Sequence, residues 1–151
     1  MLQCIDHVNI VVENLAAMTA FYRDALGLQV IREVTIRGDW IESITRLRGV
    51  EADVVYLQPD SGPPLELIAY RSPRGSRPEK LGEPNTKGLR HLAFLVDNVE
   101  VAVATVQAAG GEILSPVQTV PTAQVEFEAR QKWIAYCLDP EGNLLELCDY
   151  R

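Results

Sequence analysis

The stretch LELIAYR (65–71) returns at the end of the chain as LELCDYR (145–151), and this repetition decides the fold. Five of the seven positions agree when Glu66 is aligned with Glu146, and each copy places a glutamate between two leucines. Further upstream, IDHVNIVVENL (5–15) matches LRHLAFLVDNV (89–99) when His7 is aligned with His91. Because self-similarity at a regular spacing is typical of duplicated structural units, the chain is predicted to contain two similar modules.

The predicted modules cover residues 1–72 and 88–151, and together they are expected to form one structural domain. Residues 73–87 between them are rich in proline, glycine and charged side chains, which is typical of a linker. A chain of 151 residues lies within the size range of one compact domain or of two small units that share a core.

Each module is predicted to contain a strand, a helix and then two or three strands, which is an α+β order. The opening strands, expected at 3–12 and 89–96, are apolar and short. A helix follows each of them, because Asn14 and Asn98 stand where an N-cap belongs and Gly27 stands where a left-handed residue ends a helix. Further strands are expected at 28–36, 52–58, 64–70, 112–118, about 124–129, 132–138 and 143–149, and a short helix within 38–50.

Charge and composition exclude several classes of partner. The chain has a formal net charge of −7 and no basic stretch, so neither nucleic acid nor an anionic membrane is expected to bind. Its three cysteines include no CxxC pair, which predicts reduced thiols and a cytoplasmic location. The N-terminus lacks the pattern of a signal peptide, and no apolar run approaches the length of a membrane span.

Two histidines and two glutamates occupy equivalent positions of the repeat. Alternate side chains of a strand share a face, so Glu66 and Glu146 are expected to point away from the leucines that flank them. His7 and His91, the only histidines of the chain, follow the same parity in the opening strands. A carboxylate on an apolar sheet is costly unless it is paired or binds a cation, and imidazole with carboxylate suits a divalent metal.

Simpler interpretations of these residues remain open at this point. A single histidine at the start of a strand is usually a surface or core residue, and a glutamate between leucines is usually solvated on the wet face of a sheet. Duplication alone also copies a structural pattern. The segment 37–50 holds Arg37, Trp40, Arg46 and Arg48, which form either a binding site for an anionic group or a solvated loop with scattered charges.

The chain resembles the vicinal oxygen chelate superfamily, which includes glyoxalases, epimerases, extradiol dioxygenases and bleomycin-binding proteins. The resemblance covers nearly the whole chain and rests on IDHVNIVVENLAAMTAFYRDALGL (5–28), GLRHLAFLVDNVEVAVATVQAAGG (88–111) and DPEGNLLEL (139–147). It implies an α+β fold in which two βαβββ modules in tandem form a cupped mixed sheet around a metal site.

The resemblance also implies a ligand set and a reaction. His7, Glu66, His91 and Glu146 match the family's metal ligands, and this set is most similar to that of lactoylglutathione lyases. The implied cofactor is a divalent metal ion, namely Ni, Co, Zn, Mn or Fe. The implied activity is that of a lyase or isomerase that chelates a small-molecule substrate through two vicinal oxygens and stabilises an enediolate, with Glu146 as the catalytic base. The alternatives are an extradiol-type ring-cleavage dioxygenase and a non-catalytic small-molecule-binding or resistance protein.

Two further expectations concern the oligomeric state of the protein and the role of Cys148. Each module supplies only two of the four implied ligands, so the site needs two modules, either within one chain or across two chains. Unpaired sheet edges favour pairing and homodimers are the commonest assembly, so a homodimer is predicted. Cys148 shares a strand face with Glu146 and is expected to be structural or to line the pocket rather than to act as a nucleophile.

Overall fold

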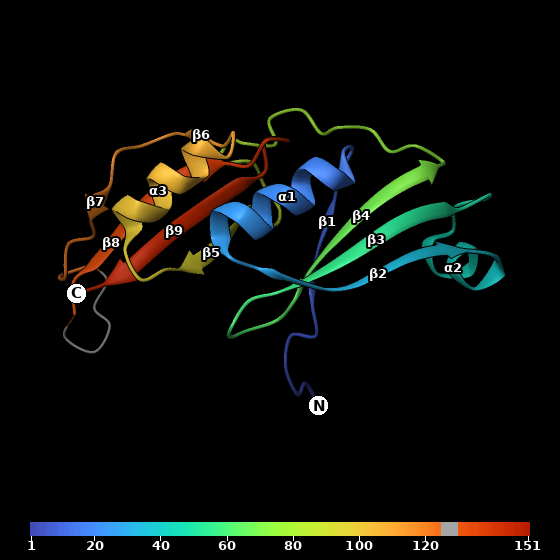
Figure 1. Cartoon of the computed structure of the whole chain (residues 1–151), viewed down its shortest axis with the longest axis horizontal. Coiled ribbons are helices and arrows are strands. Elements are labelled where there is room, and N and C mark those ends of the chain that lie inside the picture. The colour runs from blue at the N-terminus through green and yellow to red at the C-terminus, as the bar shows by residue number, and fades with distance from the viewer. Residues whose placement is uncertain (125–129) are drawn as a thin grey trace. The chain divides into compact units, whose positions relative to one another are not determined.

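A computed structural model, which describes residues 1–124 and 130–151, divides the chain into an N-terminal unit, Met1–Arg77, and a C-terminal unit, Pro78–Arg151. The N-terminal unit holds a four-stranded sheet and the C-terminal unit a five-stranded one. Each unit runs from a strand to a helix and back to strands (Figure 1). The α+β class and the tandem βαβββ modules are therefore confirmed, whereas the linker at 73–87 stays a prediction.

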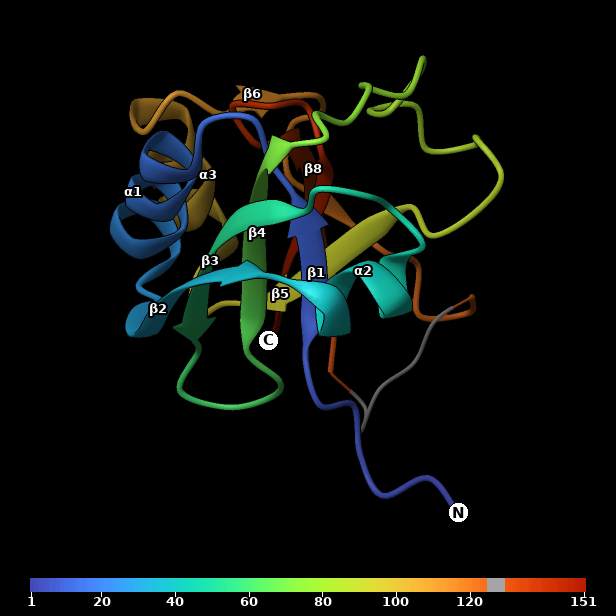
Figure 2. The same cartoon turned by 90° about the vertical axis from the view of Figure 1, so that its right-hand side faces the viewer.

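The N-terminal unit forms a mixed sheet with strand order β1-β4-β3-β2 (Figure 1). The outer strand β1 runs parallel to β4, and the other neighbours are antiparallel. The helix α1 packs against β3 and β4 (Figure 2). The elements are β1 (Val8–Val11), α1 (Leu15–Leu26), β2 (Gln29–Arg37), α2 (Asp39–Thr45), β3 (Glu51–Gln58) and β4 (Leu65–Ser72).

Local sequence explains where α1 begins and ends. The Asn14 side chain accepts a hydrogen bond of 3.1 Å from the Ala17 amide, which satisfies one of the free donors of the first turn. Gly27 ends the helix with a φ of 73°, a conformation that costs glycine little. Between them, Met18 and Tyr22 are fully buried on the face toward the sheet. The predicted caps and helix are confirmed.

The C-terminal unit repeats this arrangement with strand order β5-β9-β8-β6, and β7 pairs separately with β8. Here β5 runs parallel to β9, and α3 packs against β8 and β9 (Figure 1). The elements are β5 (His91–Leu95), α3 (Val99–Ala108), β6 (Glu112–Ile113), β7 (Gln118–Thr119), β8 (Lys132–Leu138) and β9 (Leu144–Tyr150).

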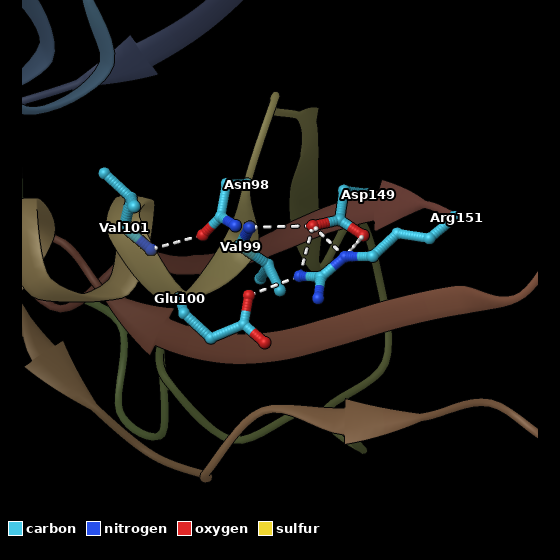
Figure 3. A network of polar contacts seen from close by, with 6 residues as sticks. All are labelled: Asn98, Val99, Glu100, Val101, Asp149 and Arg151. Carbon is cyan, nitrogen blue, oxygen red and sulfur yellow. Dashed lines mark hydrogen bonds and ion pairs between the residues drawn. The ribbon is translucent and has the colours of Figure 1, made fainter.

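Two side chains hold the start of α3 (Figure 3). Asn98 accepts a hydrogen bond of 2.8 Å from the Val101 amide, as the repeat of the Asn14 cap predicts. The buried Asp149 carboxylate accepts a second one, of 2.8 Å, from the Val99 amide. Because the first amides of a helix carry partial positive charge, a carboxylate placed there stabilises the helix. This second contact ties α3 to the last strand.

The helix α3 ends against the sheet in a way that requires a glycine. A Cβ atom at Gly111 would lie 2.6 Å from a Val106 methyl carbon and 2.9 Å from the Leu138 carbonyl oxygen. Real side chains do not tolerate contacts this short, so only glycine fits between the helix end and β8. Gly27, its equivalent in the repeat, has no atom within 4 Å of such a Cβ and is required for its positive φ instead.

Some predicted strands are wrong in extent. The opening strand was expected at 3–12 but covers only Val8–Val11. The Val8 amide donates to the Pro64 carbonyl at 3.0 Å, and the prolines at 63 and 64 offer no amides that could extend the pairing.

The strand expected at 112–118 is interrupted, since β6 ends at Ile113 and β7 begins at Gln118. Between them, the Ser115 hydroxyl accepts a hydrogen bond of 3.2 Å from the Tyr136 amide, in place of a strand partner. Pro116 follows and has no amide to donate. The strand expected at about 124–129 lies outside the described residues except for residue 124, which is in a turn.

The repeated leucines lie on the helix-covered faces. Leu67 and Leu147 are fully buried, and Leu65 and Leu145 are buried beside them. The parity of the strands therefore turns Glu66 and Glu146 toward the opposite faces, as predicted. Among the described residues, none of the helices combines the length and the apolar character that crossing a lipid bilayer requires.

Candidate metal centre

In the N-terminal unit, a histidine, a glutamate and a tyrosine lie together on one sheet face. The His7 Nε2 atom lies 3.4 Å from the Glu66 Oε2 atom. Tyr56 donates its hydroxyl proton to Glu66 Oε1, and its ring meets the His7 ring edge-on at a centroid distance of 6.2 Å. This hydrogen bond, burial and the negative charge of Glu66 together raise the pKa of Tyr56 to about 12.

Two further groups hold this cluster. Asn9 donates from its amide nitrogen to Glu66 Oε2 at 2.6 Å. On the other side of the imidazole, His7 Nδ1 lies 2.7 Å from Asp6 Oδ2. A proton on Nδ1 shared with Asp6 leaves the Nε2 lone pair directed toward Glu66, which is the orientation that a metal-binding histidine adopts.

The C-terminal unit places the equivalent residues in the same way. The His91 Nε2 atom lies 3.5 Å from Glu146 Oε2, and the His91 and Tyr136 rings are 5.4 Å apart. The glutamate side chain is only 7% exposed. Burial first, and then the negative charge of Glu146, raise the pKa of Tyr136. Each unit therefore contains a His–Glu–Tyr cluster.

Strand register produces both clusters. Tyr56 stands directly opposite Glu66 across β3 and β4, and Tyr136 stands opposite Glu146 across β8 and β9. Directly opposed side chains on one face of a sheet lie within contact distance. The parallel outer strand of each unit, β1 or β5, brings the histidine to the other side of the glutamate.

The donor set of each pair fits a divalent cation. The separations of 3.4 and 3.5 Å between Nε2 and Oε2 are longer than an ordinary hydrogen bond. An imidazole nitrogen and a carboxylate oxygen that bind one metal ion at about 2.0–2.2 Å lie about 3–3.5 Å apart. A cation between them satisfies both lone pairs at these separations, so imidazole and carboxylate in each unit match the implied group.

The partner of the glutamate differs between the two units. Lys132, which has no equivalent beside Glu66, places its Nζ atom 2.6 Å from Glu146 Oε1. Burial lowers the pKa of Lys132, but the hydrogen bond and the negative charge of Glu146 outweigh it, so the pKa is raised overall. On the other flank, Ala93 occupies the register position that Asn9 has beside Glu66.

Each predicted histidine therefore lies beside the predicted glutamate of its own unit. The assembly of His7, Glu66, His91 and Glu146 into one site stays a prediction, because two of the four belong to each unit. Within residues 1–124 and 130–151, no group of three or more His, Cys, Asp or Glu side chains is gathered in a metal-binding arrangement.

The sequence reasoning missed the two tyrosines and the lysine. The alignment that places Glu66 on Glu146 also carries Tyr56 onto Tyr136, so the tyrosines could have been found from the same repeat. The lysine could not, because the equivalent residue in the first module is Ala52, and a search for repeated residues passes over a position that differs.

Other candidate residues lie near or apart from these clusters. Cys148 is buried, and burial raises the pKa of its thiol, which suits the small structural residue that was expected. In the segment 37–50 the expected short helix is present as α2. Trp40 is exposed within it, and Arg46 ends it with a φ of 59°. An anion-binding role for this segment stays a prediction.

The whole chain has relatives among known proteins. Residues 4–147 match the model of the Glyoxalase/Bleomycin resistance protein/Dioxygenase superfamily. The uncharacterized protein YwkD of Bacillus subtilis is 31% identical over 149 residues, which are 97% of each chain. The uncharacterized protein YaeR of Escherichia coli is 29% identical over 148 residues, which are 97% of this chain and 95% of that protein. A crystal structure of a glyoxalase family protein from Bacillus cereus superposes with a TM-score of 0.84 at 23% identity, covering 99% of this chain and 95% of that one.

Proposed function

Since the chain belongs to the glyoxalase/bleomycin resistance protein/dioxygenase superfamily, we propose that it is a divalent-metal-dependent lyase or isomerase of the glyoxalase type. The observation that supports this most is the matched pair of His–Glu contacts, at 3.4 Å in one unit and 3.5 Å in the other. The proposed ligands are His7, Glu66, His91 and Glu146, and the substrate is a small molecule with two neighbouring oxygens.

A bound divalent ion would act as a Lewis acid and stabilise the negative charge that develops on the substrate oxygens. The chain's own residues would move the proton. The Glu146 carboxylate takes it from the carbon next to a carbonyl and returns it to the neighbouring carbon, so that no atom is gained or lost. Only 7% of the Glu146 side chain is exposed, which limits the access of water to this step.

The two glutamates are suited to different roles. Both oxygens of Glu66 are held, one by the Tyr56 hydroxyl and the other by the Asn9 amide. Such a carboxylate is fixed in place and suits a permanent ligand. Of the contacts to Glu146, the closest is to Lys132, whose long flexible side chain permits movement. A charged partner that can move together with the carboxylate supports the assignment of Glu146 as the base.

The rival functions make different demands on the metal. A ring-cleavage dioxygenase needs Fe(II) with open positions for oxygen, and four protein ligands leave fewer of these than a facial triad does. A binding or resistance protein would hold its ligand without turnover and without a metal. Measurement of the metal content, followed by tests for oxygen consumption, separates the three functions.

The central experiment is metal analysis of the purified protein and of the His7→Ala, His91→Ala double variant. We expect one divalent ion per set of four ligands in the unmodified protein and less than about a tenth of that in the double variant, because each half of the set has lost its nitrogen ligand. Glu79→Gln, an exposed change outside both clusters, is the control and should keep the full metal content. Stoichiometric metal in the double variant would refute the assignment.

We further propose a homodimer with two equivalent sites, because neither unit holds more than two of the proposed ligands. Mixing Glu66→Ala with Glu146→Ala tests whether each site is built from both chains. A shared site leaves one of the two sites intact in each heterodimer and restores activity, whereas a site within one chain leaves both broken. A monomeric mass in solution, with metal and activity retained, would reject the dimer.

A further inference from the structure

Around the two glutamates, equivalent positions on the sheet faces carry the same kind of side chain except at two places, Asn9, whose equivalent is Ala93, and Ala52, whose equivalent is Lys132. In the N-terminal unit the face beside Glu66 is apolar, and Ala52, Val54 and Ile68 form its buried cluster. The alignment of Glu66 with Glu146 carries these three onto Lys132, Ile134 and Cys148. Two of the three replacements keep an uncharged side chain, whereas the third introduces an ammonium group next to the proposed base.

The cross-strand partner at this position is a tyrosine in both units. Ala52 stands opposite Tyr70 across β3 and β4, and Lys132 stands opposite Tyr150 across β8 and β9. The lysine therefore occupies a site where the fold places a methyl group in the other unit, opposite the same kind of residue. The two units therefore differ at this position in the chemistry of the side chain, while the residue opposite it is a tyrosine in both.

Lys132 lies in a partly closed place, next to the Glu146 carboxylate and an aromatic ring. Its side chain is 18% exposed, and its Nζ atom lies 6.0 Å from the centre of the Tyr150 ring. The Arg130 guanidinium lies 5.7 Å from the same ring. Lys132 and Arg130 therefore both lie near the Tyr150 ring.

In the proposed metal site, the positive charge of Lys132 is not fully balanced by the nearby carboxylates. A divalent ion held by both Glu66 and Glu146, as proposed above, would be neutralised by the two carboxylates. Lys132 then adds one positive charge at a place where solvent reaches little of the side chain. A partly buried charge that is not balanced is unfavourable, and an anion that approaches it gains a strong, charge-assisted hydrogen bond.

We propose that Lys132 binds an anionic group of the substrate, a carboxylate or a phosphate, that is separate from the two oxygens directed to the metal. This inference rests on the proposed function, because it assumes that a divalent ion occupies the glutamates. It narrows the substrate class to anionic compounds and makes Lys132 a specificity-determining residue. Neutral compounds with the same two oxygens would bind less tightly.

The test compares hydroxamic acids that chelate a metal in the same way and differ only at the far end. Butyrohydroxamic acid ends in a methyl group, succinomonohydroxamic acid in a carboxylate, and 3-phosphonopropionohydroxamic acid in a phosphonate. Their affinities are measured with the cobalt-loaded protein from the visible spectrum of the ion, which requires no turnover. A charge-assisted hydrogen bond corresponds to about tenfold or more in affinity, so we expect the better of the two anionic probes to bind about tenfold more tightly than the methyl probe.

Substitutions at Lys132 show whether this residue causes the preference for the anionic probes over the methyl probe. Lys132→Met should reduce it to less than about threefold, and Lys132→Arg should retain most of it, because arginine keeps the positive charge. Lys87→Met removes an exposed lysine outside the clusters and should leave the preference unchanged. The preference of the unmodified protein and that of Lys132→Arg remain measurable even if Lys132→Met does not fold.

The outcomes separate this inference from the function on which it rests. If the unmodified protein takes up no cobalt, both proposals are overturned. If it takes up cobalt but shows no preference for an anionic probe, or if Lys132→Met weakens all three probes equally, only the role of Lys132 is overturned. Undiminished preference in Lys132→Met would likewise assign the anion site to other residues.

Discussion

The two units build the same His–Glu–Tyr cluster but hold its glutamate by different means. In the N-terminal unit two neutral donors, from Asn9 and Tyr56, contact the Glu66 oxygens. In the C-terminal unit the Lys132 ammonium donates a hydrogen bond of 2.6 Å to Glu146 Oε1. The pairing of each glutamate with its tyrosine and the buried leucines agree between the units, so the difference around the two glutamates lies in the polar side chains. The two units therefore share the strand pairing that forms the cluster, whereas the electrostatic surroundings of their glutamates differ.

A second difference concerns the repeated sequence itself. LELIAYR and LELCDYR differ at two positions, and at one of them Ala69 and Asp149 stand on the helix-facing side of β4 and β9. The carboxylate of Asp149 caps α3 and binds Arg151 at 2.8 Å (Figure 3). The equivalent Arg71 instead pairs with Asp53 and Glu51 on the neighbouring strand. One repeated arginine therefore serves two unrelated networks.

The largest effect is expected where the two units agree, in the cores. Leu67→Ala and Leu147→Ala each remove a fully buried side chain, and each should lower the free energy of unfolding by about 2–5 kcal/mol. Urea unfolding measures both losses. Leu47→Ala, at a leucine that is 41% exposed, is the control and should cost about 1 kcal/mol or less. A loss at one leucine less than half that at the other would show that the two cores are not equivalent.

The next effect should separate the two glutamates. Glu146→Gln leaves the Lys132 ammonium without its anionic partner and should lower the free energy of unfolding of the metal-free protein by about 1–3 kcal/mol. Glu66→Gln keeps an oxygen that accepts from neutral donors and should cost about 1 kcal/mol or less. The measurement is urea unfolding in the presence of a chelator.

A double variant shows whether the lysine causes this difference. Lys132→Met combined with Glu146→Gln removes both members of the pair and should recover part of the loss, since no partly buried charge remains unpaired. Equal costs for Glu66→Gln and Glu146→Gln, with no recovery in the double variant, would show that the distinction between the units has no energetic consequence.

A smaller effect, of about 0.5–2 kcal/mol, is expected for Asp149→Ala, which removes a helix cap that the N-terminal unit lacks. The effect should depend on pH. Burial alone would raise the pKa of Asp149, but its hydrogen bonds from Arg151 and from the Val99 amide outweigh this and lower the pKa below the ordinary value.

The sign of the pH dependence follows from that direction. A carboxyl whose pKa is lower in the folded than in the unfolded state stabilises the protein above the unfolded pKa of about 3.9, and this stabilisation is lost as pH falls through the folded pKa. The free energy of unfolding measured between pH 5 and pH 3 should therefore fall less steeply in Asp149→Ala than in the unmodified protein. Asp60→Ala, an exposed control, should keep the original slope, and a slope unchanged in Asp149→Ala would contradict the assignment.

The features that could be predicted from the sequence are those with a local cause or an exact repeat. Asn14 and Asn98 cap helices because the asparagine side chain reaches the first-turn amides wherever the helix starts. The orientation of Glu66 and Glu146 follows from strand parity, which needs no knowledge of the partner strand.

The features that could not be predicted depend on partners distant in the sequence. The opening strand is short because the residues before β4 are prolines, and the break near Pro116 depends on the Ser115 hydroxyl taking an amide of β8. Lys132 could not be predicted for a different reason. Comparing the two modules finds the residues that they share, and at this position the modules differ.

The smallest effect is expected at the repeated arginines, and it should distinguish their networks. The Arg71 side chain is 55% exposed, and its pairs with Glu51 and Asp53 are open to solvent, so Arg71→Met should lower the midpoint of thermal unfolding only slightly. Because salt screens exposed pairs, that small difference should disappear at high ionic strength.

Arg151→Met should behave differently, although the arginine itself is also accessible. Its partner Asp149 has a side chain that is only 4% exposed, and its guanidinium lies 4.7 Å from the centre of the Trp133 ring. Removing the cation leaves a buried carboxylate with less compensation, and salt reaches this site poorly, so the loss in the thermal midpoint should exceed that of Arg71→Met and persist at high ionic strength. Equal losses that salt abolishes in both variants would show that the repeated arginine has the same minor role in each unit, and that the network around Asp149 adds nothing to the second.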